Sequence, residues 1–504
     1  MTADVHVPPG TFLGHPRGLF LLFATEMWER FSFYGLRALL VLYAVAATEA
    51  ANPGLGWGSA QALKLYAWYT GLIYLTPLLG GWLADNFLGQ RKAVIIGGIM
   101  MALGQFSLAS PPDLLGSSAP WSLAALGIDF PATPTSFYLG LALMILGNGF
   151  FKPNISTMVG ELYLPGDARR DGAFTIFYMG INVGAFLAPL VCSTLGEDPV
   201  YGWRTGFLAA GIGMTLSVII QLAFARHYIG DLGVVPAARR SLALAGGQQQ
   251  PLTPVERDRL RVIFVIFIFV MMFWAAFEQA GGLLNLFADR HTERVVGTFT
   301  VPTGWFQSLN PLFIVLLAPL FSLLWSRLGA RGRNPPTPVK MYSGLLLVAV
   351  GFMFLVIAVF EMQRSADLKA GMVWLVLGYL FHTMGELCIS PVGLSMITKL
   401  APLRLGSLMM GVWFLINFFA NTLAGYVGAF SEDMGSYGWM QALALSVGVR
   451  AEHAGLLGIF GGVALVLVLF TLLLWALSGR IVGWMHGAEG PQRLPESQRT
   501  AQAG

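Results

Sequence analysis

The sequence predicts an all-α membrane protein whose 12 transmembrane helices form two six-helix bundles, with both ends of the chain in the cytoplasm. Of its 504 residues, 56% are apolar and only 11% are charged, and the mean hydropathy is +0.67. This composition is typical of chains that cross a bilayer many times. About twelve apolar segments are each long enough to span roughly 30 Å of hydrocarbon. Lysine and arginine gather in alternate connections between these segments, as expected on the cytoplasmic side.

The apolar segments divide the chain into two bundles and three polar regions. We predict a cytoplasmic tail at 1–17, a bundle at 18–227, a cytoplasmic linker at 228–259, a second bundle at 260–478 and a second tail at 479–504. The predicted segments are 18–47, 60–84, 92–110, 136–160, 172–195, 204–227, 260–288, 303–326, 338–361, 371–398, 406–429 and 455–478. With both tails inside, the inward regions hold roughly 20 basic residues and the outward connections roughly 6, which is the asymmetry of the positive-inside rule.

The connection at 228–259 separates two halves of similar design. Its middle, GGQQQP at 246–251, has the composition of a flexible linker. The sequence LADNFLGQRK at 83–92 follows the second segment, and LWSRLGARGR at 324–333 follows the eighth. These equivalent positions form a weak internal repeat, as in transporters that are built from related bundles.

The first of these loops resembles the loop motif of the major facilitator superfamily. In that superfamily an aspartate and basic residues latch helix ends together in one state. The resemblance implies the major facilitator fold for this chain and a gating latch at Asp85, Arg91 and Lys92. The alternative is a turn that only follows the positive-inside rule.

The first apolar segment carries charges that cannot face lipid. A charge near the middle of a bilayer costs roughly 2.5–3.5 kcal/mol, whereas each Leu, Ile, Phe or Val returns only about 0.3–0.6 kcal/mol. These charges are therefore expected to pair inside a protein-lined cavity. On a helix, one face carries all four charges and two aromatic rings: Glu26, Glu29, Arg30, Phe33, Tyr34 and Arg37.

Ionisable residues within the apolar segments differ in sign between the two halves. A zwitterion is expected to bind between them, with its carboxylate toward Arg37 and Lys152 and its amine toward Glu386. We hypothesise that Lys152 and Glu386 pair until substrate or a proton breaks the pair. A second proton-sensitive cluster is expected at Glu26, Glu29 and Arg30, unless the last two only brace the first helix. Glu278 is a further candidate proton site.

Motifs in both halves resemble signatures of the proton-dependent oligopeptide transporter family. They are EMWERF at 26–31, FFKPNIS at 150–156, FTIFYMGINVGA at 174–185, FWAAFEQ at 273–279, SLNP at 308–311 and GELCISPVGLS at 385–395. The resemblance implies the same charged poles and adds Asn182 and Asn310 as contacts to the amine or carbonyl groups. It also places Tyr34 and Tyr69 near the peptide unit. Bonding between neighbouring helices is the alternative role for the two asparagines.

Three further residues are candidates for lining the substrate pocket. Trp274 lies one helical turn from Glu278, and Ser390 lies one turn after Glu386. Trp413 is an aromatic candidate for a side-chain pocket, because apolar contacts tolerate many substrate side chains. Most aromatic residues in such a chain instead face lipid or neighbouring helices, and Ser390 has the alternative of bonding to its own helix.

The sequence therefore favours a proton-coupled symporter that imports di- and tripeptides by alternating access, as a monomer in a bacterial inner membrane. A proton gradient supplies the energy, and neither a cofactor nor a nucleic-acid partner is expected. Phe33 stands where many peptide-transporting members have Tyr, so a member specialised for nitrate, another small anion or peptide-like drugs is the alternative. An intramembrane enzyme is disfavoured because the sequence lacks HExxH and a His/Cys cluster, and a channel because the ionisable groups are unlike in sign and form no rings.

Overall fold

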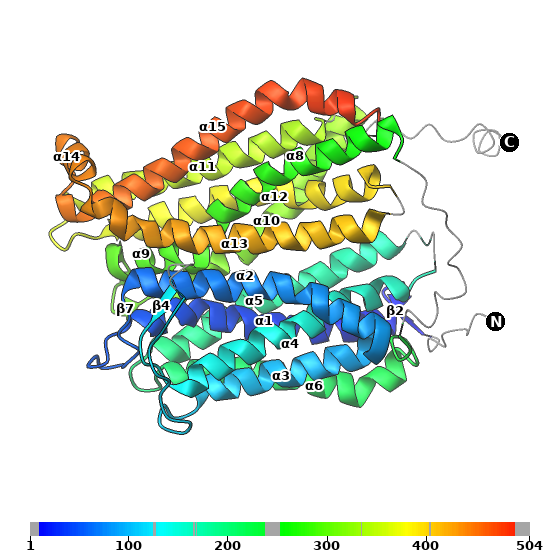
Figure 1. The fold of residues 1–504 in the computed structure, drawn as a ribbon, viewed down its shortest axis with the longest axis horizontal. Helices are drawn as coiled ribbons and strands as arrows, with labels where there is room; N and C mark the ends of the chain where they lie inside the picture. Colours follow the sequence, from blue (N-terminus) through cyan, green and yellow to red (C-terminus); the bar gives the residue numbers. More distant parts are fainter. Residues whose placement is uncertain are drawn as a thin grey trace.

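The computed structural model describes residues 10–123, 128–164, 167, 169–236, 252–333, 335–402 and 405–488. Its long helices lie side by side along one direction (Figure 1). The start of α1 and the end of α15 lie at one end of the molecule, which we call the termini end. The opposite end carries α9 and α14, and we call it the far end.

The first half of the chain forms one side of the molecule. Its helices are α1 (Arg17–Val45), α2 (Ser59–Leu83) with the π-helical extension η1 (Ala84–Leu88), α3 (Gln90–Ala109), α4 (Thr135–Glu161), α5 (Arg169–Glu197) and α6 (Trp203–Tyr228). Their inward side chains form one buried hydrophobic cluster, to which the second half adds Leu286 and Ala429.

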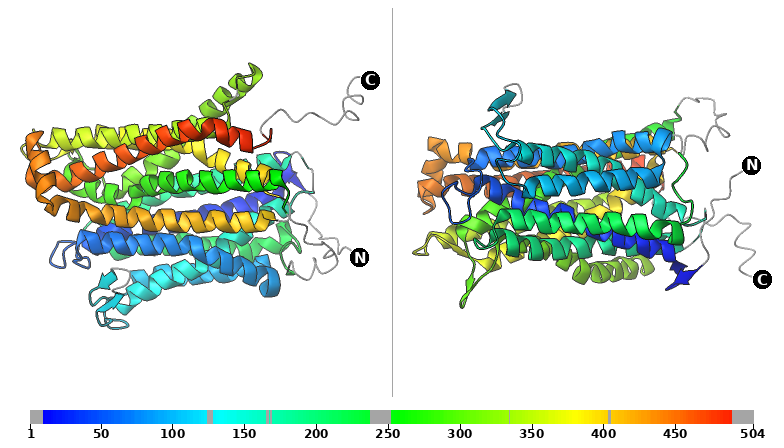
Figure 2. Two further views of the ribbon diagram at one scale, coloured as in Figure 1. Left: turned by 45° about the horizontal axis from the view of Figure 1, so that its top comes forward. Right: turned by 90° about the horizontal axis from the view of Figure 1, so that it is seen from below.

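The second half packs on the other side (Figure 2). Its helical elements are α8 (Pro254–Phe277), η3 (Glu278–Gly281), α9 (Leu283–His291), η4 (Thr303–Ser308), α10 (Leu309–Ala330), α11 (Thr337–Met362), α12 (Met372–Leu400), α13 (Gly406–Ser436), α14 (Gly438–Ser446), η6 (Ala451–His453) and α15 (Ala454–Trp484). A second buried hydrophobic cluster comes from this half alone. Each half thus has a largely separate core.

The predicted segment at 260–288 is interrupted rather than continuous. Helix α8 ends at Phe277, and the chain turns through η3 before α9 begins. A Cβ atom at Gly281 would lie 2.1 Å from the Tyr66 hydroxyl and 2.6 Å from Arg37 Nε. Only glycine permits this approach to α1 and α2. The contact with these two helices therefore explains why position 281 is a glycine.

Nine helical segments of the described chain are long and apolar enough to cross a membrane. Helices α1, α2 and α4 are not among them, although the sequence predicts twelve spans. For α1 the reason is charge, because any stretch of 18 residues along this helix holds at least three charged residues. A helix with this charge content needs protein on its charged face.

Short strands pair outside the long helices, where the sequence analysis expected none. The pairs are β1 (Thr11–Phe12) with β2 (His15–Pro16), β3 (Trp121–Leu123) with β4 (Ile128–Phe130), β5 (Thr292–Glu293) with β8 (Ala370–Gly371) and β6 (Val295–Val296) with β7 (Phe299–Thr300). These strand pairs lie in the segments before and between the helices and do not change the helical architecture.

Parts of the predicted linker and tails lie outside the described residues, namely 237–251, 1–9 and 489–504. The flexible-linker prediction for 246–251 therefore stays a prediction. Helix α8 begins after Thr253, whose hydroxyl accepts a hydrogen bond from the Glu256 backbone N–H at 3.2 Å, as in a capping box. Helix α15 continues past 479, the predicted start of the tail, to Trp484.

Candidate functional site

Arg30 lies between two glutamates of its own helix. Its Nε is 3.1 Å from Glu26 Oε1 and makes a short contact with Glu29, while its Nη2 donates to Glu29 Oε1 at 2.8 Å. Asn148 of α4 donates to the same Glu29 oxygen at 3.2 Å. The three charged residues are only 2%, 0% and 4% exposed for Glu26, Glu29 and Arg30. The charged face predicted from the sequence is thus a compact ion cluster inside the first half.

Arg37 joins the two halves directly. Its Nη2 is 2.9 Å from Glu278 Oε2, and both side chains are less than a tenth exposed. Its Nε donates to the Tyr66 hydroxyl at 3.0 Å. The sequence analysis named Arg37 and Glu278 as site residues, but the structure shows that they are partners across the interface between the halves.

Glu386 belongs to a small polar group in the second half. Asn310 Nδ2 donates to Glu386 Oε2 at 2.8 Å and to the Thr383 hydroxyl at 3.1 Å. The Thr383 hydroxyl in turn donates to the Tyr379 carbonyl at 2.8 Å. Asn310 therefore links α10 to α12 and orients the buried carboxylate, which is the alternative role of bonding between helices. Its predicted contact with the substrate stays a prediction.

Lys152 lies against an aromatic ring rather than a carboxylate. Its Nζ is 4.3 Å from the centre of the Tyr74 ring, a distance typical of a cation–π contact. Among the described residues no ion pair joins Lys152 to Glu386, which accepts from Asn310 instead. The predicted Lys152–Glu386 pair is absent from this conformation and stays a prediction for another state of the transport cycle.

Two predicted pocket residues carry buried polar atoms without a protein partner. Within the described part of the chain, neither the Tyr69 hydroxyl nor Trp274 Nε1 has a hydrogen-bond partner. The Trp274 ring packs edge-on against Phe273 and Phe277. An unpaired buried donor is costly, and the predicted contact of these two groups with the substrate stays a prediction.

The other four predicted contacts take different positions. The Tyr34 ring lies 5.7 Å from Arg37 Cζ, so it belongs to the charged group. Asn182 Nδ2 donates to the Tyr178 carbonyl of its own helix at 2.9 Å. Trp413 packs against Phe267, with ring centres 6.0 Å apart, and Ser390 is half-buried on α12.

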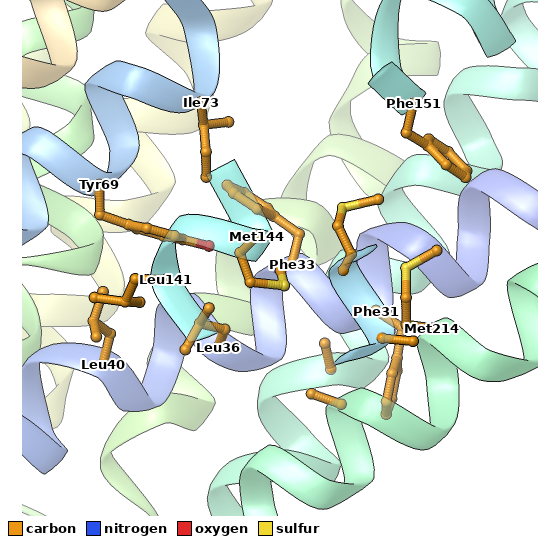
Figure 3. Close-up of a cluster of buried hydrophobic side chains, with 14 of the residues drawn as sticks. Phe31, Phe33, Leu36, Leu40, Tyr69, Ile73, Leu141, Met144, Phe151 and Met214 are labelled. Carbon is orange, nitrogen blue, oxygen red and sulfur yellow. The ribbon is translucent and has the colours of Figure 1, made fainter. Parts of the chain in front are cut away.

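Phe33 bridges the ion cluster and the hydrophobic core of the first half. Its ring centre lies 5.2 Å from Arg30 Cζ. The side chain is 6% exposed and belongs to the same buried cluster as Ile73, Met144 and Tyr69 (Figure 3). The Phe33 ring is therefore packed in the core with the Arg30 guanidinium group against it.

The predicted loop latch contacts its own half. Arg91 Nη1 donates to the Gly230 carbonyl at 2.8 Å, and the Arg91 backbone N–H donates to Gly233 at 2.9 Å. These contacts tie the start of α3 to the chain after α6. Asp85 lies in η1, and the Lys92 side chain is exposed. A latch between helix ends at these residues stays a prediction.

Sequence reasoning missed four polar residues of the site: Asn148, Tyr66, Tyr74 and Thr383. Helical spacing carried a signal for three of them. Asn148 precedes Lys152 by four residues on α4, and Thr383 precedes Glu386 by three on α12, so each shares a face with a recognised residue. Tyr66 also precedes a recognised residue, Tyr69, by three on α2; Tyr74 carried no such signal, because tyrosines are common in apolar helices.

Two helical bundles that enclose buried, oppositely charged residues define a multi-pass membrane transporter. A model of the POT family matches residues 91–231 and 248–440, more than half of the chain. The chain belongs to this family, the proton-dependent oligopeptide transporters. Peptide transporter YePEPT of Yersinia enterocolitica is 38% identical over 484 residues, covering 85% of this chain and 90% of the relative. A di-/tripeptide transporter of Lactococcus lactis is 36% identical over 460 residues, covering 80% and 87%.

Solved structures of the family share the fold over nearly the whole chain. A mutant of a peptide transporter POT in complex with alafosfalin has a TM-score of 0.79 and 34% identity, covering 95% of this chain and 98% of that one. A POT family transporter in complex with 5-aminolevulinic acid has a TM-score of 0.79 and 27% identity, covering 94% and 99%.

Proposed function

We propose that this protein is a proton-coupled symporter that imports di- and tripeptides by alternating access. The observation that carries the proposal is the pair of charged poles at the interface between the halves. Arg37 and Lys152 come from the first half, and Glu278 and Glu386 from the second. A zwitterionic peptide satisfies both poles at once, whereas an anion such as nitrate gains nothing from a carboxylate. Relatives named as peptide transporters support the same substrate class.

All twelve long helices are proposed to cross a bacterial inner membrane, with the termini end in the cytoplasm. The basic residues of the alternate connections support this orientation. The bundles at 18–227 and 260–478 then rock against each other about the midplane site. In this structure the halves meet at the far end, where Arg290 Nη1 donates to the Ser59 hydroxyl at 2.8 Å and Asn285 Nδ2 to the Ala38 carbonyl at 2.9 Å. The far end corresponds to the closed outer side.

The peptide is proposed to bind with its carboxylate toward Arg37 and Lys152 and its amine toward Glu386. Asn310 already holds the Glu386 carboxylate in place. Tyr69 and Trp274 offer their unpartnered polar atoms to the peptide backbone. Tyr34, Asn182, Ser390 and Trp413 complete the proposed lining.

Proton coupling is proposed to follow from exchange of ionic partners. While Arg37 binds Glu278, the buried carboxylate has a cation beside it. When a peptide carboxylate draws Arg37 away, Glu278 is left buried without its cation, and taking up a proton removes the cost of that charge. Glu26, Glu29 and Arg30 are proposed as the second proton-sensitive group. The transporter is proposed to work as a monomer, without a cofactor.

Uptake of dialanine into proteoliposomes tests the proposal. An inward proton gradient is expected to drive uptake by the wild type, and an uncoupler is expected to abolish it. Glu386→Gln is expected to lose this uptake, because it removes the charge that binds the amine. Glu49→Gln, at an exposed site in the connection after α1, is the matched control and is expected to transport normally. A folded wild type that takes up no dialanine, or that binds nitrate without competition from dipeptide, would overturn the assignment.

A further inference from the structure

At the far end, the last residue of α5 reaches from the first half to the second. One carboxylate oxygen of Glu197 accepts a hydrogen bond from the Thr303 backbone N–H at 2.6 Å, and the other accepts from the Gly304 N–H at 2.8 Å. These two residues open η4, which leads into α10. Glu197 therefore ties a backbone turn of the second half to the first half through both of its oxygens.

The surroundings hold this carboxylate in place. Arg294 Nη1 lies 4.0 Å from Glu197 Oε2, and Arg294 Nη2 lies 3.2 Å from Asp289 Oδ1. The Thr303 hydroxyl donates to the same Asp289 oxygen at 3.2 Å. The Glu197 side chain is only 14% exposed. Hydrogen bonds from N–H groups to a carboxylate are roughly twice as strong as neutral ones, so this contact is a strong one between the halves.

Close packing surrounds the carboxylate along the same seam. A Cβ atom at Gly304 would lie 1.9 Å from Ser193 Oγ, so Gly304 packs directly against the Ser193 side chain. The Trp305 indole N–H donates to the Thr194 hydroxyl at 2.9 Å, and the Ser308 hydroxyl donates to the Phe186 carbonyl at 2.8 Å. Opening the far end requires these contacts and both Glu197 bonds to break.

We infer that Glu197 is a latch for the outer gate, a positioning residue for transport that holds the far end closed while the cytoplasmic side releases substrate. The inference rests on the orientation in the proposed function. Within the described residues, no hydrogen bond or ion pair joins Glu197 to Arg37, Glu278 or Glu386. The latch thus sets the balance between outward- and inward-facing states without contacting the substrate.

Replacement of Glu197 by glutamine tests the latch directly. Glutamine has an NH2 group in place of one carboxylate oxygen, and this donor cannot accept a hydrogen bond from the backbone N–H that it faces. One of the two hydrogen bonds is therefore lost. We expect the ratio of open to closed outer gates to rise about tenfold, since a bond to a charged group contributes enough for such a change. Spin labels at V200C and V296C, two exposed far-end positions on opposite halves, report the gate distance in liposomes. The native Cys192 and Cys388 are buried.

Uptake kinetics give a second readout that a purely structural defect would not move in the same way. If more transporters face outward, the KM for external dialanine falls, because a larger fraction is competent to bind. The maximal rate falls at the same time, because closing the gate becomes less favourable. D198N is the matched control, since among the described residues the Asp198 side chain accepts only from the Val200 N–H of its own loop, at 2.8 Å.

The donor side of the latch provides an independent pair of variants. T303P removes the N–H, and the backbone of Pro302 (φ −56°, ψ 140°) already has the extended conformation required before proline. T303V keeps the N–H and loses the hydroxyl, which donates to Asp289. We expect T303P to open the gate as E197Q does and T303V to leave it closed. The double variant E197Q/T303P is expected to open it by less than the sum of the two single effects.

Unchanged gate distances in folded E197Q and T303P, or equal opening by T303P and T303V, would overturn the latch. If E197Q does not fold, T303P against T303V decides the question. The distance measurement needs no peptide. An open gate in E197Q combined with no dialanine uptake by the wild type would therefore support the latch and reject the proposed substrate.

Discussion

Two arginines on α1 are both buried and both paired with glutamate, yet their partners come from different parts of the chain. Arg30 binds Glu26 and Glu29 of its own helix, with Asn148 of the same half alongside. Arg37, two turns further on, binds Glu278 of the second half. The exposed fractions of the two arginines are similar, at 4% and 8%. Their difference lies in what must happen to each pair when the halves move.

A bond within one half persists when the halves rock as rigid bodies, whereas a bond between the halves must break. The Arg30 cluster is therefore a permanent part of the first half, and changing it affects the stability of that half and the charge it carries. In the proposed transport cycle, the Arg37–Glu278 pair instead weights one conformation against the other. Variants of the Arg30 cluster are therefore expected to change mainly stability, and variants of the Arg37–Glu278 pair mainly the balance between conformations.

The largest effect is expected from Arg30→Met. This change leaves Glu26 and Glu29 buried without their cation, and removing one partner of a buried ion pair destabilises proteins by about 3–5 kcal/mol. Unfolding of the purified protein in detergent measures the loss. Arg37→Met is the comparison and is expected to lose less, because its pair already breaks during the proposed cycle. Equal losses would contradict the distinction between the two sites.

Glu29→Gln is expected to separate coupling from substrate movement. The amide keeps the shape of the side chain and an acceptor for Asn148, but it carries no charge and cannot take up a proton. We expect dialanine uptake driven by a proton gradient to fall more than tenfold, equivalent to about 1.4 kcal/mol. Exchange of labelled for unlabelled dialanine at equal pH is expected to persist. Gradient-driven uptake with unchanged proton stoichiometry would remove Glu29 from the coupling mechanism.

Glu278→Gln is expected to act on conformation more than on folding. It exchanges an ion pair across the interface for a weaker hydrogen bond to Arg37, a difference of about 1 kcal/mol and therefore a roughly fivefold shift toward the outward-open state. Reaction of a cysteine at Leu63, which is buried beside Gly282 at the far end, with an impermeant maleimide reports the shift. The same cysteine in the Glu29→Gln protein is the control and is expected to react at the wild-type rate.

The sequence predicted the features of the two arginine sites that depend on local pattern. Helical spacing placed Glu26, Glu29 and Arg30 on one face, and the structure shows them in contact. The helices largely follow the apolar segments, because burial of apolar residues and hydropathy coincide in a membrane protein. These features require no knowledge of which helices are neighbours.

Features that depend on packing between distant segments were not predictable in this way. Hydropathy continues through 260–288, so it gave no sign that the chain bends at Glu278, where Gly281 approaches Tyr66 and Arg37. Charge alone did not decide which acid Arg37 would bind. The expected Lys152–Glu386 pair depends in addition on the conformation, since in this state Lys152 contacts Tyr74.

The smallest effect is expected from Phe33→Tyr, which probes the boundary of the Arg30 cluster. Tyrosine keeps the ring that lies 5.2 Å from Arg30 Cζ and adds one hydroxyl. Glu26 Oε2 is buried and has no hydrogen-bond partner among the described residues, and Glu26 lies on the same helix face, two turns before position 33. We expect the hydroxyl to use this acceptor, with a gain of about 0.5–1.5 kcal/mol in stability.

A double-mutant cycle with Glu26→Gln isolates that bond. Thermal unfolding of the wild type, the two single variants and the double variant gives the coupling between positions 26 and 33. A stabilising effect of Phe33→Tyr that disappears when residue 26 is glutamine would show that the ion cluster has an unused acceptor for a tyrosine. If Phe33→Tyr destabilises the protein equally in both backgrounds, the hydroxyl is buried without a partner. The cluster is then closed on this side, and position 33 serves only to pack the ring against Arg30.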